Sequence, residues 1–340
     1  MSRISGTLHG RDWLRLQEES CALRERGLAQ GTWQNKVSHL RQYVTFTVYY
    51  NVPDFPVNLT ILLRFIALLG RSSLAANSAS NIVASIRWFT AFLDPPSVKT
   101  FESVLVTASL RGLRAQLSRP VRQMLPFSVD HLCKFYLCLD FSDVSHLSCW
   151  CAMLLAFFGC FRLSNLVPGS KNKYDPIKQL SRDDVKFEND IVLIFYKWSK
   201  TNQNCNRVAW IPIYRVNDER FDAKIYFKLL LDIVKAPKEA PLFSFRKNKF
   251  HTRNTLVKLL DICVFESGLI LGNYSWHSFR RGSAVFAFEL GLADTAVQLL
   301  GDWSSMAFKN YLEFAFLKKE AVAKKISKSF DKQLKSIVVF

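Results

Sequence analysis

Several features that would place this chain in a familiar class of protein are missing from its sequence. No apolar run reaches the roughly 18 residues that a membrane-spanning helix needs, and residues 1–10 lack the apolar core of a signal peptide. The 8 cysteines include no paired C-x-x-C spacing, which disfavours a zinc site and favours buried free thiols. We therefore expect a soluble intracellular protein that is not secreted and binds no metal.

Acidic residues are scarce relative to basic ones. The 340 residues include 46 Lys and Arg against 28 Asp and Glu, which gives a net charge of +18. Basic residues are in excess both before and after residue 118. Because such an excess attracts polyanions and otherwise repels itself, it favours a nucleic acid that touches both halves. A basic surface that is merely solvated is the alternative, and charge alone does not separate the two.

The length of the chain and one short segment together predict two domains. A single hydrophobic core rarely grows to 340 residues, and 49% hydrophobic residues are enough to fill two cores. The segment Ser118–Pro126 contains two prolines and two arginines without periodicity, which is typical of an extended linker. We therefore predict a first domain over residues 1–118 and a second over 119–340, joined by a linker at about 118–127.

Apolar side chains recur at helical spacing through the first domain and predict a small helical bundle. The predicted helices cover residues 32–50, 59–69, 77–92 and 101–117. Ser, Ala and Asn are frequent over residues 72–85, at the start of the third helix. Small polar side chains let another backbone approach closely, so this face could lie against a nucleic acid. A loosely packed surface helix is the alternative.

The second domain is predicted to begin with helices and continue as a small sheet. Ser128 is a candidate N-cap for a helix through residue 139, and residues 146–159 form the most apolar helix of the chain. Arg162 follows this helix closely, so its guanidinium would be partly enclosed and needs an anion, either a carboxylate or a phosphate. Three β-rich segments then predict an antiparallel meander, at residues 184–188, 191–198 and 207–213.

Polar residues whose side chains could take part in a reaction follow in the second half of this domain. Lys200 lies at the polar tip of the second hairpin, where a lysine is usually just solvated. Helices are predicted at residues 221–234 and 253–266. Beyond them come Trp276-His277-Ser278-Phe279-Arg280-Arg281-Gly282, Leu300-Gly301-Asp302-Trp303-Ser304 and finally Tyr311. A basic amphipathic helix at about 318–336 has an apolar row that would pack on its own domain or on a partner protomer, at Val322, Ile326, Phe330 and Leu334.

These side chains suit the cleavage of a phosphodiester without a metal. A tyrosine can attack through its phenolic oxygen, two arginines can clamp the phosphate, and a histidine can hydrogen-bond or transfer a proton. A lysine can protonate the leaving oxygen, and an indole N–H adds a donor. The chain offers such a set in the order Arg162, Lys200, His277, Arg280, Trp303, Tyr311. Each residue could instead have a purely structural role in a helix cap or a core.

The ordered set resembles the tyrosine recombinase (phage integrase) family. His277-Ser278-Phe279-Arg280 matches the His-x-x-Arg motif of that family. The segments around Arg162, around Lys200 and from Leu300 to Ser304 are similar to those that carry its first arginine, its lysine and its Leu-Gly-His-x-Ser motif. Tyr311, the only tyrosine after Trp303, matches the nucleophile. The resemblance covers roughly residues 10–330.

The resemblance implies a fold, an activity and partners. The fold would be mainly α with a small antiparallel β-sheet, in which a helical core-binding (SAM-like) domain and an α+β catalytic domain clamp double-stranded DNA. Tyr311 would form a 3′-phosphotyrosyl link, with Lys200 as general acid, and the reaction would need no ATP, metal or other cofactor. The protein would form a dimer on one site and a tetramer in synapsis through its C-terminal helix. Expected DNA contacts are Lys36, Arg41, Ser78, Asn81, Arg87, Arg119, Arg122, Thr201 and Arg281.

Two departures from the family pattern leave alternatives open. Asn165 stands where members commonly carry Glu, and Trp303 lies one position closer to the tyrosine than is usual, where Asp302 fits the spacing instead. The alternatives are a catalytically inactive or domesticated DNA-binding protein derived from a recombinase, and an enzyme similar to type IB topoisomerases. The Trp-type motif is similar to that of eukaryotic mobile-element recombinases of the Crypton or DIRS/Ngaro groups. If the protein is eukaryotic, we expect it in the nucleus, and otherwise in the cytoplasm.

Overall fold

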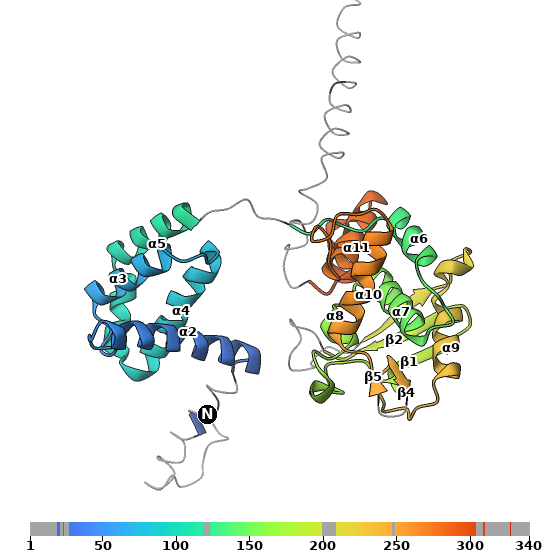
Figure 1. The fold of residues 1–340 in the computed structure, drawn as a ribbon, viewed down its shortest axis with the longest axis horizontal. Coiled ribbons are helices and arrows are strands. Elements are labelled where there is room, and N and C mark those ends of the chain that lie inside the picture. Colours follow the sequence, from blue (N-terminus) through green and yellow to red (C-terminus); the bar gives the residue numbers. More distant parts are fainter. Residues whose placement is uncertain are drawn as a thin grey trace, which may run out of the picture. The chain divides into compact units, whose positions relative to one another are not determined.

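The chain divides into two compact units, Met1–Val121 and Arg122–Phe340, in a computed structural model (Figure 1). The structure describes residues 27–117, 123–198, 209–246 and 249–303, and singly Glu19, Ser20, Leu23, Lys309 and Ser327. Within these ranges, no helix combines the length and apolar character needed to cross a membrane.

The first unit is a bundle of helices around an aromatic and aliphatic core. Tyr43 of one helix packs edge-on against Phe65 of the next, and both are buried with Leu62 and Ile86. Asn58 accepts hydrogen bonds from the N–H groups of Thr60 and Ile61, which fixes the start of the second helix. The helices are α2 (Gln30–Tyr49), α3 (Leu59–Gly70), α4 (Ala76–Leu93) and α5 (Val104–Leu117), with the 3-10 helix η1 (Pro95–Glu102) between α4 and α5.

The predicted helix over residues 101–117 is shorter in the structure. Pro95 and Pro96 start the 3-10 turn η1, which continues through Phe101 and Glu102, and α5 begins only at Val104. Phe101 is buried, but it belongs to η1. Its apolar side chain fits the helical spacing of α5, which is why the predicted helix began too early. The other three predicted helices of this unit are confirmed. The apolar faces of α3 and α4 line the core, whereas α2 contributes Tyr43 and Phe46 and leaves Val48 exposed.

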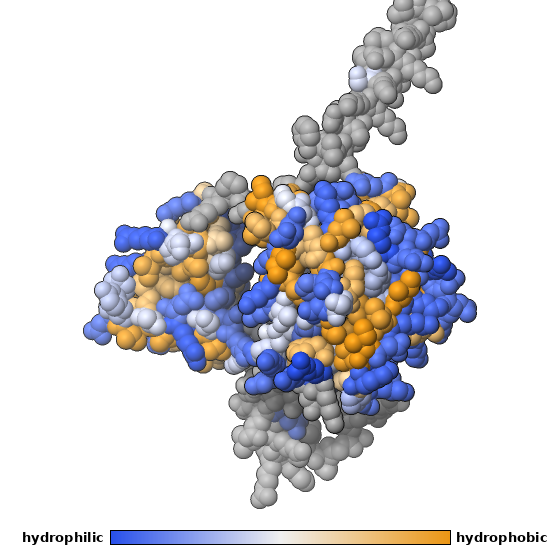
Figure 2. All heavy atoms as spheres, turned by 45° about the vertical axis from the view of Figure 1, so that its right-hand side comes forward, coloured by the Kyte–Doolittle hydropathy of each residue, from blue (hydrophilic) through white to orange (hydrophobic). Residues whose placement is uncertain are grey.

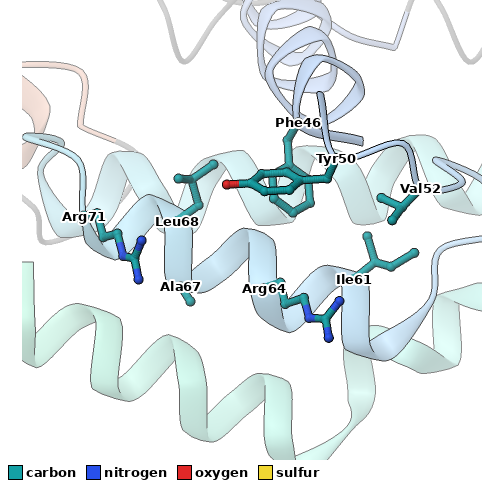
Figure 3. Close-up of a pocket in the computed structure, with 8 residues that line it drawn as sticks. All are labelled: Phe46, Tyr50, Val52, Ile61, Arg64, Ala67, Leu68 and Arg71. Carbon is teal, nitrogen blue, oxygen red and sulfur yellow. The ribbon is translucent and has the colours of Figure 1, made fainter. Parts of the chain in front are cut away.

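A hollow with an apolar floor opens between the end of α2 and α3 (Figure 3). It encloses about 310 Å³, and its lining includes Phe46 and Leu68. Arg64 and Arg71 extend from α3 at its edge.

The second unit is built around α7 (Val144–Phe158), which lies among other helices in Figure 1. Every side chain from Leu147 to Phe157 is buried, as expected for a helix that is apolar on all sides. It contacts α9 (Ala223–Ile233), α10 (Arg253–Glu266) and α11 (His277–Glu289). The remaining helices are α6 (Val129–Leu137), α8 (Leu163–Leu166), α12 (Asp294–Leu300), η2 (Lys171–Lys173), η3 (Arg182–Asp184) and η4 (Glu219–Phe221).

The predicted meander is confirmed as a three-stranded antiparallel sheet in the order β1-β2-β3. Its strands are β1 (Val185–Glu188), β2 (Ile191–Tyr196) and β3 (Ala209–Tyr214), and a short hairpin of β4 (Ser244–Arg246) and β5 (Lys249–Phe250) was not predicted. Val192, Ile194 and Tyr196 of β2 are buried while the residues between them are more exposed. The alternation turns one face of the sheet toward the core that α7 fills.

Apolar and hydrophilic side chains are interspersed over the face drawn in Figure 2. Exposed apolar residues occur in both units, among them Tyr49 of α2 and Phe265 of α10.

Candidate functional site

A tight exit from α7 positions Arg162. The helix ends at Phe158, and Cys160 adopts a left-handed backbone conformation with φ of +52°. A Cβ at Gly159 would lie 2.7 Å from the ring of Phe161, so only glycine fits at the end of this helix. Arg162 then precedes α8 and is half-buried, and its buried Nη1 has no hydrogen-bond partner among the described residues.

The start of α11 positions His277 and Arg280 one helical turn apart, on the same side of the helix. Arg280 is only 2% exposed. Its Nη1 donates to the carbonyl of Cys160, 120 residues away, and its Nη2 donates to the carbonyl of Gly301. Arg280 therefore ties the exit of α7 to the end of α12 and is held in one orientation.

Arg162, His277 and Arg280 line one cavity of about 360 Å³. This volume is within the range of small-ligand sites and is large enough for a phosphate group. Three guanidinium groups and an imidazole face one carboxylate in the lining, so the electrostatic balance favours an anion. The other lining residues are Phe161, Leu163, Ser164, Arg253, Val257, Leu260, Asp261, Tyr274, Ser275 and Trp276.

The imidazole of His277 is neutral at physiological pH. The pKa of His277 is lowered to about 4. The larger cause is loss of hydration on the packed side of the ring, and the second is repulsion by the charges of Arg280, Arg281 and Arg162. The residue remains exposed on its other side, so water moderates both effects. A bound phosphate would add negative charge and raise this pKa, which couples anion binding to protonation of the ring.

The indole of Trp303 packs against the guanidinium of Arg280. The guanidinium carbon of Arg280 lies 4.4 Å from the centroid of the indole, a cation–π contact. The ring is buried in a small cluster with Cys160 and Val297, and a Cβ at Gly301 would overlap it at 1.9 Å. Trp303 is absent from the lining of the Arg162 cavity. Its predicted role as a donor to phosphate stays a prediction, while its contact with Arg280 gives it a positioning role.

Asp302, the competing assignment, lines a different cavity of about 500 Å³. This cavity lies between the exit of α7, the end of α12 and strands β2 and β3, and Arg280 contributes to its wall as well. Its lining is otherwise mostly apolar, with Phe158, Tyr196 and Trp210. Asp302 therefore does not share the cavity of Arg162 and His277.

Several predicted site residues lie outside the described residues: Arg119, Arg122, Lys200, Thr201, Tyr311 and, apart from Ser327, the C-terminal helix at 318–336. The segment that leads from β2 toward Lys200 is described up to Trp198. Asn165, 2% exposed, donates from Nδ2 to the carbonyl of Trp198 at 2.7 Å. The neighbouring Lys197 forms an ion pair with Asp184 at 2.6 Å. Asn165 thus holds the segment that follows β2.

Arg281, a predicted DNA contact, is turned into the protein. It is 6% exposed and donates from Nη1 to the carbonyl of Met124 and from Nη2 to Oε1 of Gln123. The next residue explains the geometry, because a Cβ at Gly282 would lie 2.0 Å from the carbonyl oxygen of Phe127. Because α11 packs so closely on the segment before α6, the side chain of Arg281 is enclosed by protein. This geometry gives no support to a contact between Arg281 and DNA.

The five candidate DNA contacts of the first unit all lie on α2 and α4, which pack against each other. Arg41, Ser78, Asn81 and Arg87 are exposed. Lys36 is half-buried, with its Nζ 5.1 Å from the ring centroid of Trp88. Arg87 pairs with Glu102 at 2.9 Å, which offsets part of its charge. Contact with DNA stays a prediction for all five.

Sequence reasoning gave no site role to several polar residues that line the cavity, among them Arg253, Asp261 and Trp276. Arg253 and Asp261 lie on α10 with Val257, at the spacing of one helical face. A helical wheel of residues 253–266 would have shown this shared face. It could not have shown that the face meets Arg162, because that depends on packing between distant segments.

No family model and no curated protein matches this chain. Solved structures do match. Lambda integrase (residues 75–356) bound to DNA has a TM-score of 0.54 and 19% identity over 91% of this chain and 98% of that chain. The Tn1549 transposon integrase with transposon right end DNA has a TM-score of 0.59 and 14% identity over 91% and 98%. XerH site-specific recombinase bound to a palindromic difH substrate has a TM-score of 0.52 and 13% identity over 86% and 78%. This chain therefore has the fold of the tyrosine recombinases and integrases.

Proposed function

We propose that the protein is a site-specific DNA recombinase or integrase. The observation that carries the proposal is that Arg162, His277 and Arg280, from two distant segments, line one cavity. The similar solved structures support it, since they are recombinases and integrases bound to DNA, with lambda integrase as a dimer or a tetramer. The excess of positive charge supports the same partner.

In the proposed reaction, Arg162 and Arg280 hold the two non-bridging oxygens of a DNA phosphate. The phenolic oxygen of Tyr311 attacks phosphorus, the bond to the 5′ oxygen breaks, and Lys200 protonates that oxygen. Neutral His277 hydrogen-bonds the phosphate or takes the phenolic proton. The 3′-phosphotyrosyl bond conserves the free energy of the phosphodiester, so attack by another 5′-OH rejoins DNA without ATP, metal or other cofactor.

The first unit is proposed to close on DNA as a helical core-binding domain, with α2 and α4 toward the duplex. Their exposed basic and small polar side chains support this orientation. Self-association into a dimer on one site and a tetramer in synapsis, through residues 318–336, is part of the proposal. A eukaryotic mobile-element origin, of the Crypton or DIRS/Ngaro type, rests on the Trp303 motif alone.

Adduct trapping tests the proposed chemistry. A duplex nicked near the cleavage position lets the freed 5′ end diffuse away, so a covalent protein–DNA adduct should accumulate and survive denaturing electrophoresis. Tyr311→Phe should form none, while the control Tyr214→Phe, at an exposed position of β3, should react as wild type does. Equal trapping by Tyr311→Phe would show that the nucleophile is wrong.

A second measurement separates the recombinase from its rivals. Mixing two duplexes should produce a four-way junction and recombinant strands. Relaxation of supercoiled DNA by a monomer, without strand exchange, would instead indicate an enzyme of the topoisomerase IB type. Tight DNA binding with no adduct on any nicked substrate would indicate an inactive descendant of a recombinase.

A further inference from the structure

The indole of Trp276 lies beside the candidate catalytic residues and has an unsatisfied donor. Trp276 is 6% exposed and immediately precedes His277 and helix α11. Its ring packs against Phe279, with the ring centroids 5.2 Å apart. The buried Nε1 donates to no acceptor among the described residues. Since buried donors are nearly always paired, this atom requires an explanation.

The comparison with Trp150 makes the unsatisfied indole more informative. Trp150 is fully buried in the same unit, and its Nε1 donates to the carbonyl of Arg220 at 3.0 Å. The fold can therefore satisfy an indole in its core. Trp276 differs in that it lines the cavity of Arg162, His277 and Arg280.

A second unsatisfied donor lines the same cavity. Nη1 of Arg162 is also buried without a hydrogen-bond partner among the described residues. Two unpaired donors in the wall of one cavity point to a ligand that carries several acceptor oxygens. The surrounding positive charge selects an anion over a neutral ligand. Hydrogen bonds of this kind often form only when the ligand enters and the side chains adjust to it.

We propose that Nε1 of Trp276 donates a hydrogen bond to a non-bridging oxygen of the DNA phosphate that Arg162 and Arg280 hold. This inference rests on the proposed function and adds a donor to it. Trp303, which stacks on Arg280, then positions the guanidinium, and Trp276 supplies the indole N–H that contacts the phosphate. The carboxylate of Asp261 also lines the cavity and is the competing acceptor.

Paired substitutions to phenylalanine separate a binding role from a packing role. Trp276→Phe retains an aromatic ring next to Phe279 and removes the unpaired donor, so the melting temperature should stay the same or rise. Adduct formation on the nicked duplex should slow by about tenfold to a hundredfold, as expected for a lost hydrogen bond to a charged group. Trp150→Phe should lower the melting temperature and leave the adduct rate of the folded enzyme unchanged, because its indole bonds to Arg220 instead.

A titration with inorganic phosphate tests the anion contact without catalysis. In a ¹⁵N–¹H spectrum of the full chain, the indole resonance that disappears in Trp276→Phe should shift on phosphate addition. The resonance that disappears in Trp150→Phe should not shift. Repeating the titration in Asp261→Asn tests the competing acceptor, because an indole bound to that carboxylate would shift on this substitution before any phosphate is added.

The outcomes distinguish this inference from the proposed function. If wild type forms an adduct, but Trp276→Phe reacts at the same rate and the Trp276 indole resonance does not shift on phosphate addition, the inference is overturned and the proposed function stands. If wild type forms no adduct while the Trp276 resonance responds to phosphate, the proposed function fails and the anion contact stands. A fall in melting temperature like that of Trp150→Phe, with an unchanged adduct rate, would assign Trp276 to the core.

Discussion

Two walls of the candidate cavity hold an arginine in different ways. On the α11 wall, Arg280 is buried, bonded to two backbone carbonyls and stacked on Trp303. On the wall formed by the exit of α7, Arg162 is only half-buried, and its Nη1 has no hydrogen-bond partner in the part of the chain that the structure describes. The first arginine is oriented before any ligand arrives, while the second has a donor still to be satisfied. The fold thus fixes the orientation of one arginine in advance, and the other arginine completes its hydrogen bonds only when a ligand binds.

The largest effect is expected for Arg280→Ala. This change removes a phosphate contact and leaves the carbonyls of Cys160 and Gly301 without their donor. We expect adduct formation to fall by a factor of at least about 100 and the free energy of unfolding to fall by about 2–3 kcal/mol. Single-turnover cleavage and urea denaturation measure the two effects. A fully stable variant would mean that the carbonyl contacts do not hold the two segments together.

Arg162→Ala should separate activity from stability. Because its Nη1 donates to none of the described residues, we expect a loss in cleavage rate of about 100-fold with a change in unfolding free energy below about 1 kcal/mol. The same two assays apply. A loss of stability as large as that of Arg280→Ala would contradict the proposed difference between the two walls.

A smaller, pH-dependent effect is expected for His277. Its pKa of about 4 in the folded protein is below the ordinary value of 6.5, so the unfolded chain binds a proton more readily. The neutral ring therefore fits the fold without penalty above pH 6.5, and stability falls as the pH drops from 6.5 toward 4. The melting temperature of His277→Gln should fall less than that of wild type over this window.

His251 requires its own control in that experiment. Burial lowers the pKa of His251 to about 4 as well, so it destabilises the fold in the same window. His251→Asn should remove that second contribution while leaving the response of His277 intact. Inorganic phosphate should reduce only the loss of stability that His277 causes at low pH, because a bound anion raises the pKa of a group in the cavity. An identical response of both histidines to phosphate would place the anion elsewhere.

The smallest effect is expected in the first unit, at Arg41. This exposed arginine of α2 would contribute one phosphate contact. Arg41→Ala should weaken DNA binding modestly and reduce the slope of log K against log salt by roughly one, without changing the cleavage rate of bound DNA. Binding measured at several salt concentrations tests this. As a control, Arg111→Ala removes an exposed arginine from α5 and should leave the slope unchanged.

Much of the fold followed from local patterns. The apolar periods of α3, α4 and α10 and the alternation in β2 are short-range properties, because each reflects which side chains of one element face a core. The prediction failed locally at residues 101–103, where a buried phenylalanine belongs to a 3-10 turn instead of to α5. Ser103, which leaves the helical backbone conformation between η1 and α5, marks that boundary, and hydrophobic spacing alone could not indicate it.

The sequence by itself determined the residue types, their order along the chain and the excess of positive charge, and these indicated phosphate chemistry. Only the tertiary structure decided that Arg280 bridges the exit of α7 and the end of α12, that Arg281 turns inward and that Trp276 borders the cavity of Arg162. The physical reason is that a side chain's partners depend on contacts between segments far apart in the chain. Close approaches at Gly159, Gly282 and Gly301 set those contacts, and a motif records only its own neighbours.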